Sequence, residues 1–132
     1  MPLNHTAALI TIAAPNFDRL VCFYKALFTQ ETTAYTPNVY AEFQLPGLKL
    51  GLYRPKANNE SRMANDELRT PHFALHTHVS LCLEVMDLEV AIAHLTALGY
   101  PPPGKILTAS HGREVYAYDP DGNRLILHQG IG

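Results

Sequence analysis

The sequence is poor in the features that mark secreted, membrane-spanning and nucleic-acid-binding proteins. No charged-then-apolar leader and no apolar run of about 18 residues is found, so neither secretion nor membrane spanning is expected. Ten basic residues stand against twelve acidic ones without runs, for a formal net charge of −2. Nucleic-acid binding requires clustered Lys and Arg, and is therefore not expected. These absences favour a cytoplasmic protein with no nucleic-acid or membrane partner.

Cysteine is also scarce, with two residues in a chain of 132. Cys22 falls in a helical pattern and Cys82 in an apolar strand pattern, so buried free thiols are expected rather than a disulfide. The chain is long enough for one domain that buries roughly two-thirds of its unfolded surface. Neither a disulfide nor a structural metal is needed for folding.

The apolar period changes between about 2 and 3.6 along the chain, in the same order twice. Asn16 precedes a helical pattern that begins at Phe17, and Asp87 precedes a second one that Gly99 ends. The predicted strands are Ala7 to Ala14, Thr33 to Tyr35, Tyr40 to Leu45, Leu48 to Tyr53, His78 to Val85, Ile106 to Thr108, Glu114 to Tyr118 and Arg124 to His128.

This order predicts an α+β fold, in which two βαβββ modules form a curved mixed sheet around a cleft. A single domain over residues 1–132 would contain module one at about 7–55 and module two at about 77–130. The residues at about 56–71 are polar and without clear period, so they are interpreted as a linker.

The run from Asp119 to His128 predicts a tight turn that leads into the final strand. Pro120 presets φ for the first corner, Gly122 can take a positive φ, and Asp119 and Asn123 can hydrogen-bond nearby backbone. The same run resembles the signature of the vicinal oxygen chelate superfamily, which includes glyoxalase I, extradiol dioxygenases, and fosfomycin and bleomycin resistance proteins. The run Pro15 to Leu27, with its Phe-Tyr pair, is similar to the start of the first helix in that family.

The resemblance implies a divalent ion held by His or Glu at three or four positions, where it would bind two substrate oxygens. The matching first-strand position is Leu9, the fourth-strand one lies near Gly51, and the last-strand glutamate is replaced by Ile126. The fifth-strand histidine is kept as His78. A single imidazole holds a metal poorly, so the usual metal site is expected to be absent and no cofactor is predicted.

An alternative is a displaced site for a metal such as zinc, nickel, manganese or iron, with His78 and His128 as its first ligands. Without a metal, His78 would line the cleft and hydrogen-bond to a neighbour or to solvent. Ser80 should share the face of His78, and Tyr116 is a further residue for the cleft. The pattern leaves open which face Tyr40, Tyr53, Tyr118 and Glu42 occupy.

Three functions remain open at this point. The first is binding of an unidentified small organic molecule in the cleft, without metal and without an assigned catalytic residue. The second is a metal-dependent lyase, isomerase or dioxygenase with an unorthodox His-based ligand set. The third is a non-catalytic structural or regulatory dimer. A homodimer is expected in each case, because the resemblance implies one and short curved sheets leave edge strands that need cover.

Overall fold

The computed structural model describes residues 3–4, 6–56 and 79–131, and it confirms the α+β class. The chain divides into two compact units, Met1–Ala57 and Asn58–Gly132. The predicted linker, apart from its first residue, and the predicted strand start at His78 lie outside the described residues. No helix in the described part of the chain is long and apolar enough to cross a membrane.

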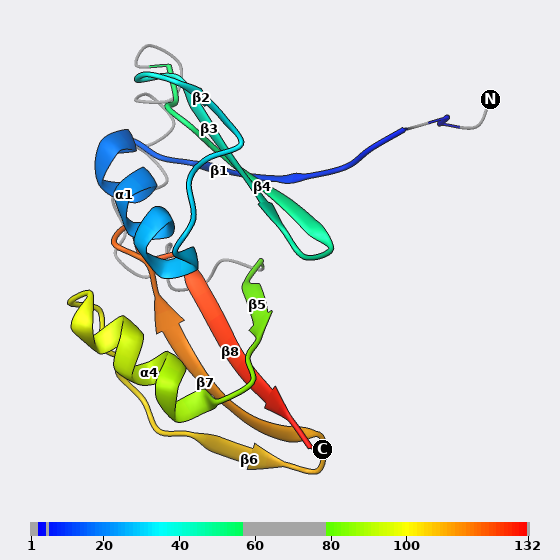
Figure 1. Ribbon diagram of the computed structural model, residues 1–132, viewed down its shortest axis with the longest axis vertical. Coiled ribbons are helices and arrows are strands. Elements are labelled where there is room, and N and C mark those ends of the chain that lie inside the picture. The colour runs from blue at the N-terminus through cyan, green and yellow to red at the C-terminus, as the bar shows by residue number, and fades with distance from the viewer. Residues whose placement is uncertain (1–2, 5, 57–78, 132) are drawn as a thin grey trace, which may run out of the picture. The chain divides into compact units, whose positions relative to one another are not determined.

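The first unit holds one helix and a four-stranded mixed sheet (Figure 1). Strand β1 runs parallel to β4, and β2, β3 and β4 are antiparallel neighbours in the order β1-β4-β3-β2. The elements are β1 (Ile10–Ala13), α1 (Phe17–Phe28), β2 (Ala34–Thr36), β3 (Tyr40–Leu45) and β4 (Leu48–Tyr53).

Helix α1 packs on one face of this sheet, against β4. The ring of Phe28 meets that of Phe43 edge-on, with 5.6 Å between centroids. Alternate residues of β3 and β4 point to the same side, because side chains alternate along a strand. The buried apolar residues of helix and sheet are Phe17, Leu20, Val21, Phe23, Tyr24, Ala41, Phe43, Leu45, Leu50 and Leu52.

The second unit repeats the order of elements of the first, as the sequence predicted. Its sheet has the order β5-β8-β7-β6, with β5 parallel to β8 and the other pairs antiparallel. Helix α4 packs against β8. The elements are β5 (Leu81–Glu84), α4 (Leu88–Ala97), β6 (Leu107–Ala109), β7 (Gly112–Tyr118) and β8 (Arg124–Gly130).

Several predicted strand bounds were wrong by a few residues. β1 begins at Ile10 rather than Ala7, because Ile10 already lies opposite Leu50 and β4 itself begins at Leu48. In this register Ala7 would lie opposite Gly47, and it therefore has no strand residue beside it. Pairing across the hairpins, rather than β-propensity, sets where each strand ends. The observed bounds are therefore displaced or extended relative to the predicted ones in β2, β6, β7 and β8.

The predicted turn before the last strand is confirmed. Asp119 is buried, and its Oδ1 accepts hydrogen bonds from the backbone N–H groups of Asp121 and Asn123, each at 2.9 Å. Its Oδ2 accepts a third from the side-chain amide of Asn123 at 2.8 Å. Gly122 has a φ of +86°, a conformation that glycine adopts without strain. The turn thus fixes where β8 begins.

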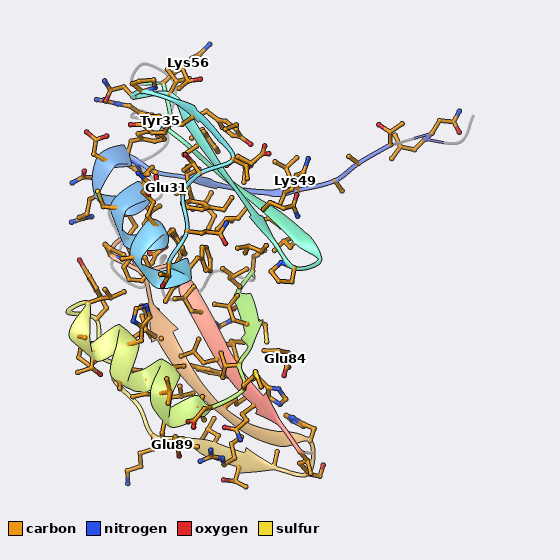
Figure 2. The ribbon with its side chains drawn as sticks, in the orientation of Figure 1. Glu31, Tyr35, Lys49, Lys56, Glu84 and Glu89 are labelled. Carbon is orange, nitrogen blue, oxygen red and sulfur yellow. The ribbon has the colours of Figure 1, made fainter. Side chains whose placement is uncertain are left out.

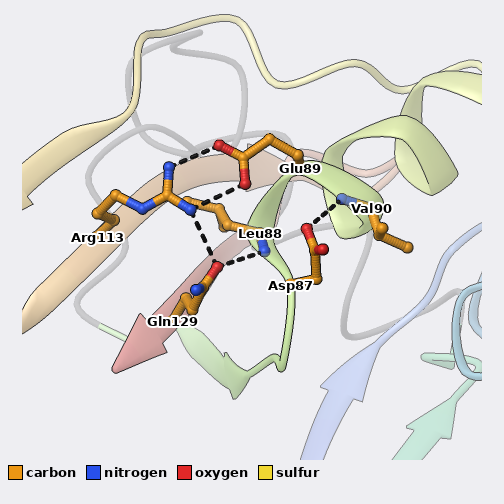
Figure 3. Close-up of polar contacts among 6 residues, drawn as sticks. All are labelled: Asp87, Leu88, Glu89, Val90, Arg113 and Gln129. Carbon is orange, nitrogen blue, oxygen red and sulfur yellow. Dashed lines mark hydrogen bonds and ion pairs between the residues drawn. The ribbon is translucent and has the colours of Figure 1, made fainter. Parts of the chain in front are cut away.

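The two helices of the described residues begin differently, although a residue suited to capping precedes each one. Asp87 has extended backbone, and its Oδ1 accepts a hydrogen bond from the N–H of Val90 at 3.0 Å (Figure 3). Asn16 is the N-cap residue of α1, as its position before Phe17 predicts, but its side chain makes no capping hydrogen bond. Its ψ of 77° departs from the extended geometry that lets a capping side chain reach the helix N–H groups.

The start of α4 is also tied to β7 and β8 by side chains (Figure 3). Arg113 donates two hydrogen bonds to Glu89, at 2.6 and 2.8 Å, and this contact lowers the pKa of Glu89 to about 2. The side-chain oxygen of Gln129 accepts hydrogen bonds from Arg113 and from the N–H of Leu88. These contacts fix α4 on the face of the sheet that Val115 and Leu127 occupy.

Both cysteines are free thiols, as predicted, but both are exposed, so their predicted burial was wrong. Cys22 points away from the side of α1 that packs on the sheet, where Val21 and Tyr24 are buried. Cys82 alternates along β5 with the half-buried Leu81 and lies on the sheet face that α4 does not cover.

Candidate functional site

One face of the second sheet is covered by α4, and no described element of this unit covers the other. The covered face holds the buried residues Val115, Ala117, Leu125 and Leu127. The alternate residues define what we call the open face. Figure 2 shows Glu84 on this face, pointing away from α4. The open face carries Cys82, Glu84, Glu114, Tyr116, Tyr118, Arg124, Ile126 and His128.

Ile126 lies in the middle of this face. It is opposite Cys82 on β5 and opposite Tyr116 on β7. Tyr116 is 37% exposed, so its ring is accessible on this face. None of the three supplies a carboxylate or an imidazole. The position at which the resemblance implies a metal-binding glutamate is therefore an apolar and aromatic surface.

Arg124 places a positive charge beside this surface. Its Nε donates a hydrogen bond to Ser80 Oγ at 2.7 Å, and its guanidinium carbon lies 5.4 Å from the ring centroid of Tyr116. Among the described residues, no carboxylate forms an ion pair with it. Ser80 and Tyr116, both predicted for the site, are thus brought together by a residue that was not predicted. Its alternation with Ile126 and His128 is the signal that could have revealed it.

The other end of the open face holds two histidines and two glutamates. His128 lies between Glu84 on β5 and Glu114 on β7, because each is its partner across the sheet. His111, in the turn between β6 and β7, places its Nδ1 3.0 Å from Nε2 of His128. Each of three residues offers one ligand atom, and the three atoms lie within 4.8 Å of one another: they belong to His111, Glu114 and His128. We call these three residues the histidine cluster.

Glu84 fixes the orientation of His128 within this group. Its carboxylate oxygen lies 2.5 Å from Nδ1 of His128, whose side chain is 13% exposed. Nδ1 must carry a proton to donate to that carboxylate, so in the neutral ring Nε2 holds the lone pair. This lone pair points toward His111. The geometry suits either a hydrogen bond from His111 or a bond to a metal.

The first sheet also has an open face, which settles the orientation of three residues that the sequence left open. Tyr40, Glu42 and Tyr53 all lie on the face away from α1. Tyr40 donates a hydrogen bond to Glu42 at 2.9 Å, and burial together with this contact raises the pKa of Tyr40. Gly51 has no side chain and so offers no metal ligand. A Cβ atom there would lie 2.5 Å from the Tyr40 hydroxyl oxygen, so Tyr40 already occupies this space.

The predicted site residues therefore have different outcomes. Tyr116, Ile126 and His128 lie on the open face of the second sheet, and Ser80 lies in the segment directly before β5, where its hydroxyl accepts a hydrogen bond from Arg124. Leu9 precedes β1 in the first unit and is 42% exposed. His78 lies outside the described residues, so its convergence with Leu9 and Ile126 stays a prediction. The described residues at the usual ligand positions do not fit a metal ion.

The chain is similar to proteins of one superfamily in sequence and in fold. No protein-family model matches it. It is 28% identical to the metallothiol transferase FosB of Shouchella clausii (strain KSM-K16), over 97% of this chain and 80% of that protein. The fosfomycin resistance protein FosX of Listeria monocytogenes has a similar fold, with a TM-score of 0.70 at 18% identity, covering 98% of this chain and 96% of that one.

A glyoxalase/bleomycin resistance protein from Catenulispora acidiphila DSM 44928 also matches in fold. Its TM-score is 0.64 at 21% identity, over 94% of this chain and 97% of that one. The two βαβββ units, the turn at Asp119 and the similarity to FosB all point to the same group. The sequence similarity to FosB and the shared fold support assignment to the vicinal oxygen chelate superfamily.

Proposed function

We propose that this protein binds a small organic molecule on the open face of its second sheet, and that it needs no metal at the usual position of the superfamily. The single observation that carries this proposal is the group formed by Ile126, Tyr116 and Arg124. An exposed ring beside an aliphatic side chain favours a flat apolar group. A guanidinium over that ring favours an anionic group next to it.

The ligand class that follows is a small organic anion with a flat apolar part. 2-Naphthoate has both features and is the probe for this class, and bleomycin and fosfomycin, which the names of similar proteins mention, are comparison compounds that lack one or the other feature. Ser80 supports the site from the side, because its hydroxyl holds Arg124 in place. Catalysis is not part of the proposal.

Substitution of Arg124 tests this site. We expect Arg124→Gln to weaken 2-naphthoate binding by about tenfold or more, because a charge-assisted hydrogen bond contributes roughly 1.5–3 kcal/mol. Titration calorimetry measures the change. Lys105→Gln is the matched control, since it removes an exposed positive charge from the loop before β6 and should leave the affinity unchanged. Equal affinity of Arg124→Gln and the parent would contradict the proposal, as would failure of 2-naphthoate to bind.

A metal-dependent transferase is the second function that an observation favours, because FosB is named a metallothiol transferase. Ile126, Leu9 and the covered position at Gly51 weigh against it, since none supplies a ligand. The two functions differ in one property. The first requires binding by metal-free protein, and the second requires a metal.

We further propose that the protein is a homodimer. Strands β1 and β5 lie at the edges of their sheets, and Ile10 on β1 is 41% exposed although it is apolar. Edge strands with exposed apolar side chains are commonly covered by a partner. We expect light scattering at micromolar concentration to give twice the chain mass. A monomer would contradict this proposal and leave the ligand site of the second sheet unaffected.

A further inference from the structure

We propose that the histidine cluster, His111, Glu114 and His128, is a binding site for a divalent transition-metal ion, with zinc as the preferred ion. This site is not the one that the resemblance implies. It lies two residues along β8 from Ile126, on the same face of the sheet. The proposal does not depend on the organic ligand proposed above, because the two rest on different side chains.

The distances within the cluster suit a single ion. Two nitrogen ligands of a tetrahedral zinc ion lie about 3.3 Å apart, because each zinc–nitrogen bond is about 2.0–2.1 Å long. His111 Nδ1 and His128 Nε2 lie 3.0 Å apart, and the ligand atoms of all three residues lie within 4.8 Å of one another. The exposed His111 ring and the half-buried Glu114 side chain can both adjust toward this geometry.

The backbone brings the three ligands together with little freedom. Glu114 and His128 are direct partners across the β7–β8 ladder, and His111 lies three residues before Glu114 in the tight turn. Gly112 next to it has a φ of +137°, and a Cβ there would lie 2.3 Å from the backbone oxygen of Gln129. The turn therefore stays close to β8, and His111 stays next to His128.

Glu84 supplies a second feature of metal sites. Metal-binding histidines usually donate their other ring N–H to a carboxylate or carbonyl oxygen, which orients the ring and makes the ligand nitrogen more basic. The contact of 2.5 Å between Glu84 and Nδ1 of His128 has this arrangement, with Nε2 directed into the cluster. Glu84 is a positioning residue, and it is not itself counted as a ligand.

The chemistry of the donors selects the class of ion. Two imidazoles and one carboxylate suit zinc, nickel or cobalt, whereas magnesium and calcium prefer oxygen ligands alone. Three protein ligands leave a coordination position for water or another small ligand, as in zinc sites with His₂Glu ligation. His111 is exposed, so this position is accessible from solvent.

Titration of the chelator-treated full-length protein with zinc chloride tests the proposal. We expect one ion per chain, and cobalt chloride should give the visible absorption of a low-coordinate site. His111→Gln and Glu114→Gln should each weaken zinc binding by at least about tenfold. Glu84→Gln should weaken it by roughly 10–100-fold through loss of orientation. His94→Gln on α4 is the matched control, because it removes another histidine of the same unit.

The variants also distinguish this site from the alternatives. His111 lies in an exposed turn, so His111→Gln should fold like the parent, as its circular dichroism will show. Zinc binding that is unchanged in both His111→Gln and Glu114→Gln would overturn the proposal. The proposal would also be overturned if His78→Gln lost zinc binding while His111→Gln kept it, because the ion would then lie elsewhere. Failure of the parent to bind zinc would also overturn it, while leaving the test with 2-naphthoate valid.

Discussion

Leu9→His combined with Ile126→Glu is expected to create a metal site that the parent lacks. If the superfamily geometry is kept, these two positions and His78 converge, and three ligands replace one imidazole and two aliphatic side chains. The background for this test carries His111→Gln and Glu114→Gln, so that the histidine cluster does not contribute. Zinc, nickel or manganese should then bind to the variant and not to its background.

The same variant should be less stable than its background when no metal is present. A carboxylate in place of the half-buried Ile126 loses the apolar contacts of that side chain and part of its own hydration beside Cys82 and Tyr116, which lowers stability or raises its pKa. Calorimetric titration measures the gain in affinity, and urea unfolding measures the loss of stability. A folded variant that binds metal no better than its background would show that the positions do not converge.

Phe43→Ala is expected to lower the free energy of unfolding by about 3–5 kcal/mol, the usual cost of removing a buried phenylalanine. Phe43 is fully buried, lies opposite Leu50 on β4 and contacts the ring of Phe28 on α1. Truncation would leave a cavity between helix and sheet, which the rigid strand pair cannot close.

Urea unfolding followed by circular dichroism measures this loss. Val39→Ala is the control, because Val39 is 54% exposed in the turn before β3, and its change should stay below about 0.5 kcal/mol. If the two variants differed little from each other, the packing of α1 on the first sheet would not be the source of stability of this unit.

The fold could be predicted from the sequence because local patterns and turn chemistry agree. Each of three local patterns indicates one structure. The alternation in β3 indicates a strand, the period after Phe17 a helix, and Gly122 a turn. Strand ends could not be predicted as well, because pairing with a neighbour decides them. Asn16 shows a similar limit, since a residue suited to capping makes no capping hydrogen bond.

The site could be predicted only in part, for a related reason. Ile126 and His128 were identified because a known motif fixes their position on β8. Arg124 follows from alternation once that face is recognised as the open one, but His111 lies in a turn where no periodicity applies. The contact between His111 and His128 depends on the β7–β8 register, which the sequence pattern does not encode directly. Glu114 belongs to the cluster because the same register places it opposite His128.

Titration of chelator-treated protein with 2-naphthoate distinguishes metal-free from metal-dependent ligand binding. Ile126, Tyr116 and Arg124 are proposed to bind the ligand without a metal at the usual position. Titration calorimetry should therefore detect binding by metal-free protein. Absence of binding until zinc, nickel, manganese or iron is restored would contradict the account, because ligand binding would then depend on a metal.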